Sequence, residues 1–159
     1  MMPQSSGESL EAALRAHVEF IAEERHPLVR GSAPASHHAA VKKYMREHFD
    51  KCGGQSELRH FDEEGVKFAN IVLKIPGADD SLPPILVTAN FDSPAGCPGA
   101  DGNASGCAVL LELASLLLAS SHQGARRTVW LVAFDLKEWG NIGSYALAKE
   151  MRGRDAQVK

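Results

Sequence analysis

Two short, mostly apolar segments that each end abruptly in polar residues constrain the fold of this chain most. The first runs from Ile85 to Ala89 before Asn90-Phe91-Asp92, and the second runs from Thr128 to Phe134 before Asp135. Runs of this length and composition are typical of strands that are buried on both faces of a parallel sheet. A strongly apolar stretch between them, Asn103 to Ala119, predicts a helix. This order of elements indicates a βαβ unit.

The first half of the chain predicts two further helices and a hairpin. An apolar stripe at three- and four-residue steps predicts a helix from Leu10 to Glu24, and Ser36 is expected to cap a second helix that ends near Cys52. Alternating segments within Glu57–Ile75 predict an antiparallel β-hairpin. A last helix is expected from Ser144 to Met151. We therefore expect an α/β fold, a three-layer α/β/α sandwich with a mixed, mostly parallel sheet.

Length and composition bound the class of protein and its partners. A chain of 159 residues that is 44% hydrophobic and 23% charged suits a single globular domain over residues 1–159. Seventeen basic and 20 acidic residues give a net charge of −3, which argues against nucleic acid as the main partner. No apolar run reaches the about 20 residues that cross a membrane, and Met1 to Ser9 lacks the apolar core of a secretion signal. We expect no membrane partner.

The cysteines and histidines give weaker signals. Cys52, Cys97 and Cys107 are odd in number, so the sequence indicates no disulfide framework and favours a reducing, cytoplasmic compartment. Cys107 lies on an apolar helix face and is expected in the core. The histidines all lie outside the two strand ends, and we expect them at the surface. They occupy positions 17, 26, 37, 38, 48, 60 and 122.

Chemistry is expected at the two strand ends, because ligands bind beyond the carboxyl ends of the strands in open parallel sheets. The first end offers Asn90 and Asp92, followed by a loop rich in Gly, Pro, Asp and Ser. The second end offers Lys137 and Glu138. Solvated strand ends and helix caps are the alternative interpretation, since Asp101 stands where it would cap the helix that follows.

Three longer motifs cover these strand ends. They are Val-Thr-Ala-Asn-Phe-Asp-Ser at 87–93, Pro-Gly-Ala-Asp-Gly-Asn-Ala-Ser-Gly at 98–106, and Val-Ala-Phe-Asp-Leu-Lys-Glu-Trp-Gly-Asn-Ile-Gly-Ser at 132–144. In order and spacing they resemble the two-zinc aminopeptidases of the aminopeptidase Y, aminopeptidase S and bacterial leucyl aminopeptidase type, over about residues 10–151. In that family two zinc ions share a bridging carboxylate and a water, and a Glu takes the proton of that water. The resemblance implies a zinc exopeptidase-like fold and a peptide substrate that is cleaved at its N-terminus.

The resemblance also implies that two metal-binding positions are substituted in the first two motifs. Asn90 occupies the position of a zinc-binding His, while Asp92 remains where the family has the Asp that orients this His. Gly102 occupies the position of the bridging Asp, and Asp101 stands beside it outside the direct ligands. A neutral amide oxygen binds zinc far more weakly than imidazole does, and glycine offers no side chain at all.

The third motif has lost the base and kept one ligand. Lys137 occupies the position of the general-base Glu, and Glu138 stands where the family has a zinc ligand. An ammonium group repels two dications and, beside Glu138, is expected to keep its proton. Enzyme status is therefore uncertain. We expect a zinc-aminopeptidase-like domain that is catalytically inactive and binds zinc weakly or not at all.

Three other functions remain open. The chain could be a non-catalytic interaction or scaffold module on the peptidase fold, an active peptidase completed by a partner chain, or an enzyme with a rebuilt site that uses Lys137. A related branch of the fold cyclises N-terminal glutamine with one zinc, but its ligands are also Asp, Glu and His, so this chain does not fit it.

The resemblance further implies that the domain is incomplete at its C-terminus. In relatives the chain continues after the last helix into a strand with an Asp ligand and later a loop with the final His. A truncated product, a partner chain that completes the sheet, and a short form that covers its own edge are the alternatives. An exposed sheet edge would favour a homo- or hetero-oligomer.

Overall fold

Four strands form one mixed sheet in the order β1-β2-β4-β3 in the computed structural model, which describes residues 9–119 and 125–157. The strands are β1 (Ser56–Glu63), β2 (Val66–Ile75), β3 (Ile85–Asn90) and β4 (Val129–Phe134). As predicted, β1 and β2 form an antiparallel hairpin, and β3 pairs parallel with β4. However, β2 runs antiparallel to β4 as well. The expectation of a mostly parallel sheet is therefore wrong among the described strands, because β2 opposes both of its neighbours.

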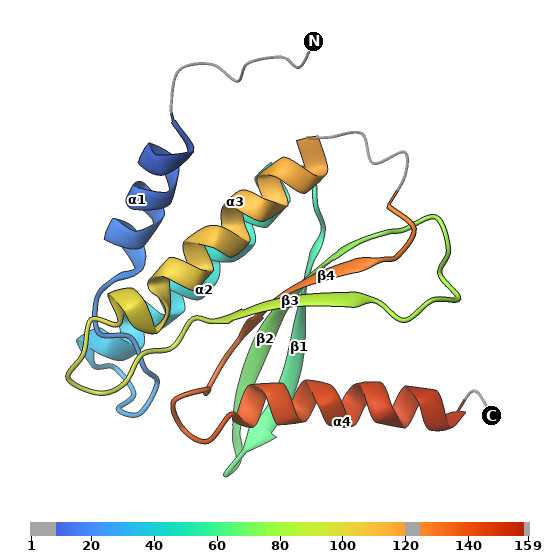
Figure 1. Cartoon of the computed structure of the whole chain (residues 1–159). Helices are drawn as coiled ribbons and strands as arrows, with labels where there is room; N and C mark the ends of the chain where they lie inside the picture. The colour runs from blue at the N-terminus through green and yellow to red at the C-terminus, as the bar shows by residue number, and fades with distance from the viewer. Residues whose placement is uncertain (1–8, 120–124, 158–159) are drawn as a thin grey trace.

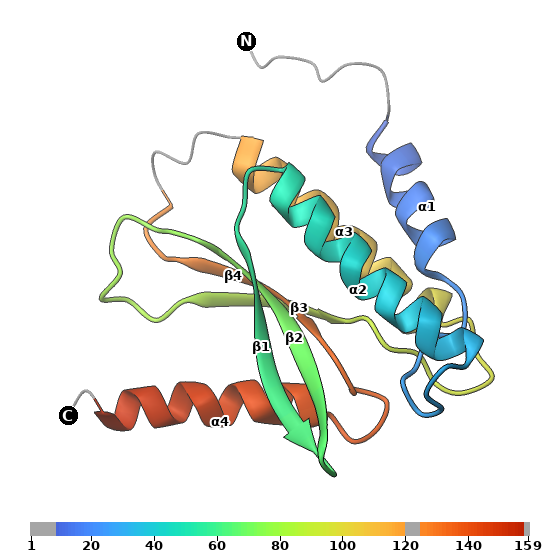
Figure 2. The same ribbon diagram turned by 180° about the vertical axis from the view of Figure 1, so that it is seen from behind.

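Helices cover both faces of this sheet (Figures 1 and 2). On one face lie α1 (Leu10–Ile21), α2 (Ala33–Lys51) and α3 (Ser105–Ala119), and on the other lies α4 (Ile142–Gln157). A large apolar core fills the space beneath the first three helices, and a smaller one lies beneath α4. The predicted three-layer α/β/α arrangement is confirmed. The two cores centre on Phe49, Ile71 and Leu131 and on Val72, Val132 and Leu147.

Several helix boundaries differ from the prediction: α1 ends at Ile21 and not at Glu24, α3 begins at Ser105 and not at Asn103, and α4 begins at Ile142 and not at Ser144. The two largest differences are at the start of α2 and the end of α4. α2 begins at Ala33 because Ser32, not Ser36, caps it; the Ser32 hydroxyl accepts a hydrogen bond of 3.2 Å from the backbone N–H three residues further on. α4 continues beyond its predicted end to Gln157. Gly153 does not stop α4, because an interior glycine costs a helix only about 1 kcal/mol.

Among the described residues, one helical stretch meets the length and composition criteria for a membrane span. α3 and the short π-helical turn before it, Ala100–Ala104, are together long and apolar enough to cross a membrane by length and composition alone. A core helix passes the same test, and α3 packs against α1, α2 and the sheet. Residues 1–8 of the polar N-terminal stretch lie outside the described residues.

The prediction of surface histidines is wrong for three of the seven. His17, His26 and His38 are only 6%, 6% and 4% exposed. Each has a polar partner inside the protein, which offsets the cost of burial. His60 is exposed as expected, and His122 lies outside the described residues.

Cys107 lies in the core, as the sequence predicts. It belongs to α3, its side chain is fully buried, and its Sγ donates a hydrogen bond of 3.1 Å to the backbone oxygen of Asn90. Burial raises the pKa of the Cys107 thiol to about 12. Only the thiolate is an efficient nucleophile, so this thiol is unreactive at neutral pH.

We expect Cys107 to resist alkylation in the folded chain. At pH 8, Cys52 and Cys97, which are both half-buried, should react with iodoacetamide at least about 100-fold faster than Cys107. Denaturant should remove the difference, because unfolding exposes all three thiols. Mass spectrometry of the alkylated peptides gives the three rates. Equal rates for Cys107 and Cys52 in the native chain would contradict the structure.

Candidate functional site

The two parallel strands end side by side, and a hydrogen bond joins the loops that follow them. Asn90 at the end of β3 lies opposite Phe134 at the end of β4. Beyond this point the backbone N–H of Glu138 donates to Oδ2 of Asp92 at 2.9 Å. With Lys137 beside Glu138, the structure brings together four of the six residues that the sequence singled out.

Asn90 is held by hydrogen bonds on both sides of its amide group. Its Nδ2 donates to Oδ1 and to the backbone oxygen of Asp92, both at 3.2 Å. Its Oδ1 accepts from Nδ2 of Asn103, also at 3.2 Å. Burial raises the pKa of Asp92, although hydrogen bonds from the Glu138 backbone and from Asn90 act in the opposite direction. The oxygen of Asn90, the only atom of its side chain suited to a metal, is therefore bound to Asn103.

Gly102 lies on the exposed turn directly before Asn103, and the fold does not require a glycine there. Its φ of −122° lies in the ordinary range of L-residues, and a Cβ built on it meets nothing within 4 Å. A carboxylate side chain would therefore fit at this position. Asp101 beside it is exposed, and its side chain makes no hydrogen bond to any described residue. The structure thus places Asp101 near the site without joining it to the network.

Lys137 and Glu138 form an ion pair at the second strand end. Nζ of Lys137 lies 2.8 Å from Oε1 of Glu138, with the two side chains 48% and 18% exposed. The hydrogen bond to Glu138 raises the pKa of Lys137. Lys137 is therefore a cation at neutral pH, in agreement with the sequence-based expectation. Such a group has no lone pair with which to accept a proton from water.

This set of side chains does not fit two zinc ions. Zinc sites in proteins are built from thiolates, imidazoles and carboxylates. No histidine occurs in residues 90–102 or 135–141. The carboxylates of Asp92 and Glu138 are engaged, since Asp92 accepts hydrogen bonds from its neighbours and Glu138 is paired with Lys137. Asp101 is exposed and does not join this network. Asn90 and Gly102 offer no thiolate, imidazole or carboxylate as a replacement ligand.

Arg25 supports the first strand end, although nothing in the sequence singled it out. Its guanidinium is fully buried, and burial lowers its pKa. Its backbone also exchanges hydrogen bonds with Ser93, which lies three residues after β3. The side chain donates at 2.7 to 3.0 Å to five backbone oxygens: those of Ile21, Glu23, Phe91, Pro98 and Gly99. It therefore connects the segment before α2 to the loop that carries Asp92.

A second buried pair supports the other strand end. Nε2 of His38 lies 2.7 Å from Oδ1 of Asp135, and both side chains are buried. The backbone N–H of Asp135 donates to Oδ1 of Asn70, whose Nδ2 donates to the backbone oxygen of Gly143. His38 and Asp135 are 97 positions apart, so no local pattern could have paired them.

Comparison with known proteins decides the family. Residues 70–159, more than half of the chain and including both strand ends, match Peptidase family M28. The chain belongs to this family. The membership that the three motifs predicted is confirmed.

Two relatives show how much of a longer protein this M28 chain corresponds to. Uncharacterized protein YfbL of Escherichia coli (strain K12) is 33% identical over 143 residues, which are 84% of this chain and 41% of the relative. A probable zinc metalloprotease of Pyrenophora tritici-repentis is 30% identical over 102 residues, 59% of this chain and 20% of the relative. The chain thus spans less than half the length of either relative.

Solved structures confirm the fold. Glutaminyl cyclase of Macrostomum lignano superposes with a TM-score of 0.64 at 24% identity, over 84% of this chain and 42% of the other. A leucine aminopeptidase precursor of Bacteroides thetaiotaomicron superposes with a TM-score of 0.59 at 19% identity, over 86% of this chain and 49% of the other. At these identities the likeness concerns architecture, and it identifies the zinc exopeptidase fold.

Proposed function

We propose that this member of Peptidase family M28 does not cleave peptides by zinc chemistry. The observation that carries the proposal is the ion pair between Lys137 and Glu138, at 2.8 Å. Glu138 alone keeps the side chain that the resemblance implies for a metal ligand, and the ammonium group of Lys137 already neutralises it. The same ammonium group stands at the position of the general base, where it holds a proton instead of accepting one.

The other two substituted positions support this proposal. The Asn90 amide is committed to Asp92 and Asn103, and it is 6% exposed. Gly102 leaves open space where the family places a bridging carboxylate. If a partner chain supplied the remaining ligands, the site would still contain the ammonium group of Lys137 and would still lack a carboxylate that bridges two metal ions. Cyclisation of N-terminal glutamine is disfavoured for the same reason, because the resemblance implies Asp, Glu and His ligands for that branch.

Assays with chromogenic aminoacyl substrates test the proposal. We expect no chelator-sensitive release of an N-terminal residue when zinc is supplied, and no difference between the wild-type chain and Glu138→Gln. Turnover that EDTA abolishes, that zinc restores and that Glu138→Gln removes would overturn the proposal.

Restoring the three family side chains should raise zinc affinity at the strand ends. We expect Asn90→His, Gly102→Asp and Lys137→Glu together to strengthen binding by about tenfold or more, because an imidazole and two carboxylates replace an amide, a hydrogen and a cation. Isothermal titration of the restored variant, with and without Glu138→Gln, measures this affinity. The zinc binding that is lost with Glu138→Gln is the binding at the strand ends. Activity should remain low, because the resemblance places two further ligands beyond these motifs.

The control for the restored variant is Lys149→Glu, which repeats the charge change of Lys137→Glu at an exposed position on α4. It should leave zinc affinity unchanged. If the restored variant binds zinc no better than this control, the roles assigned to Asn90, Gly102 and Lys137 are wrong.

A further inference from the structure

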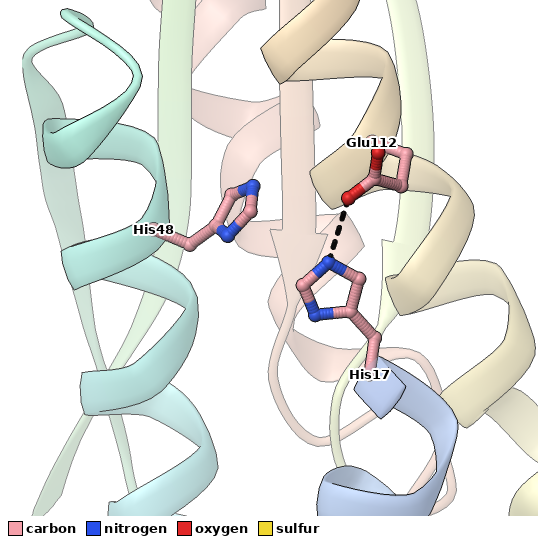
Figure 3. A group of neighbouring side chains, drawn as sticks. All are labelled: His17, His48 and Glu112. Carbon is pink, nitrogen blue, oxygen red and sulfur yellow. Dashed lines mark hydrogen bonds and ion pairs between the residues drawn. The ribbon is translucent and has the colours of Figure 1, made fainter. Parts of the chain in front are cut away.

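Three metal-binding side chains converge from three helices, away from the strand ends (Figure 3). His17 comes from α1, His48 from α2 and Glu112 from α3. One candidate ligand atom on each lies within 4.8 Å of the other two. Nε2 of His17 is already 2.9 Å from Oε1 of Glu112, and the two imidazole rings meet edge-on with centroids 4.9 Å apart.

These groups lie between packed helices. The side chains of His17 and Glu112 are only 8% and 17% exposed, and His48 is half-buried. Removing polar groups from water is costly unless they have partners inside the protein. A cation that bound all three side chains would be such a partner and would join α1, α2 and α3.

Both imidazoles have a further polar partner outside the cluster. Nδ1 of His17 lies 2.6 Å from the hydroxyl of Tyr44, and Nε2 of His48 lies 3.0 Å from the hydroxyl of Ser115. Metal-binding histidines almost always hydrogen-bond through the nitrogen that does not face the metal, which fixes the ring and its tautomer.

We propose that His17, His48 and Glu112 form a binding site for a divalent transition metal, with zinc as the ion that the donor set fits best. Two imidazole nitrogens and one carboxylate oxygen are a frequent zinc-binding set, with a fourth position left for water. The ion would take Nε2 of His17 and the His48 nitrogen that Ser115 leaves free. Ligands about 2.1 Å from a tetrahedral ion lie about 3.4 Å apart. His17 and Glu112, whose atoms are 2.9 Å apart, must therefore separate slightly, and the more distant ligand atoms, up to 4.8 Å apart, must approach by about 1 Å.

This site is independent of the proposed loss of peptidase chemistry. It uses none of the residues at the strand ends, and a metal held between the helices would fasten α1 to the rest of the domain. Zinc bound here should therefore change stability without creating turnover. The two proposals fail separately. The first fails if turnover is sensitive to chelators and depends on Glu138, and the second fails if zinc affinity does not depend on Glu112 and His48.

Zinc titration of the whole, metal-stripped chain tests the site. We expect one zinc per chain with a dissociation constant in the micromolar range or tighter, and a rise in Tm of about 5 °C at saturating zinc. Co²⁺ should bind at the same site and give the visible absorption of a low-symmetry histidine–carboxylate complex. No saturable zinc binding, or no such Co²⁺ spectrum, would overturn the proposal.

Variants locate the bound ion. Glu112→Gln and His48→Gln, which nearly preserve shape, should each weaken zinc binding by at least about tenfold, and Tyr44→Phe, which removes a partner of His17, by a smaller factor. Circular dichroism of the zinc-free variants checks that each variant folds. If a variant does not fold, the Co²⁺ spectrum of the wild-type chain tests the proposal instead. His60→Gln, at an exposed position on β1, and Glu138→Gln should change nothing. Zinc binding that survives both ligand substitutions, or that only Glu138→Gln removes, would overturn the proposal.

Discussion

Arg25→Met should destabilise the folded chain by about 3 to 5 kcal/mol, one of the largest effects expected of any single substitution here. The methionine side chain fills similar space but donates no hydrogen bond. Five backbone oxygens would then lose the Arg25 donor. Those of Ile21 and Gly99 keep a hydrogen bond from another backbone N–H, while those of Glu23, Phe91 and Pro98 lose the bond that the structure gives them. A buried acceptor without a partner loses its hydration and gains nothing in return. Denaturant unfolding followed by circular dichroism measures the change.

Two other arginine variants show whether the bonding geometry of Arg25 matters. Arg25→Lys keeps the charge but has three donors on one atom, so it should recover less than half of the loss. Arg15→Met removes the exposed pair with Glu11, in which both side chains are more than 60% exposed, and should cost less than about 0.5 kcal/mol. Equal stabilities for Arg25→Met and Arg15→Met would contradict the role assigned to Arg25.

The β and α elements were largely predictable because their signals are local. Apolar runs of five to seven residues predicted β3 and β4, and the pattern of apolar residues predicted α1, α2 and α3. The pairing of β2 with β4 was not predictable in this way. It joins segments about 60 positions apart, for example Ile71 with Ala133, and it depends on the twist and packing of the complete sheet.

The strand-end site was predictable to the extent that motif spacing determines it. The three motifs led to Asn90, Gly102, Lys137 and Glu138, and the parallel register of β3 and β4 places their loops together. Arg25 escaped prediction because its partners are backbone oxygens, which any sequence supplies. No residue type in the loop indicates that a buried cation lies beneath it.

The buried histidines escaped prediction for a related reason. His17 is 95 positions from Glu112, and His38 is 97 positions from Asp135, so neither pair has a local signature. A histidine in a predicted helix is expected at the surface unless a buried partner is known. The cluster of His17, His48 and Glu112 could therefore be recognised only from the packing of α1, α2 and α3 in the structure.

Gly143→Ala should destabilise the chain by about 2 to 4 kcal/mol, because no methyl group fits where α4 approaches the end of β4. A Cβ on Gly143 would lie 2.3 Å from the backbone oxygen of Asp135 and 2.4 Å from Oδ1 of Asn70. Both residues are buried, and Oδ1 of Asn70 accepts a hydrogen bond from the backbone N–H of Asp135, so neither residue can move without disturbing this bond. Thermal unfolding should therefore occur at a clearly lower temperature than in the wild-type chain.

Gly153→Ala is the matched control, because it makes the same chemical change on the same helix. A Cβ on Gly153 meets nothing within 4 Å, so the alanine should stabilise α4 by about 0.5 to 1 kcal/mol through its higher helix propensity. If Gly143→Ala lowers the stability and Gly153→Ala raises it, the effect of close packing is distinguished from that of helix propensity. Equal effects would mean that α4 does not pack against Asn70 and Asp135 as described. Because those residues are linked to His38, loss of this packing would also loosen the strand end that carries Lys137 and Glu138.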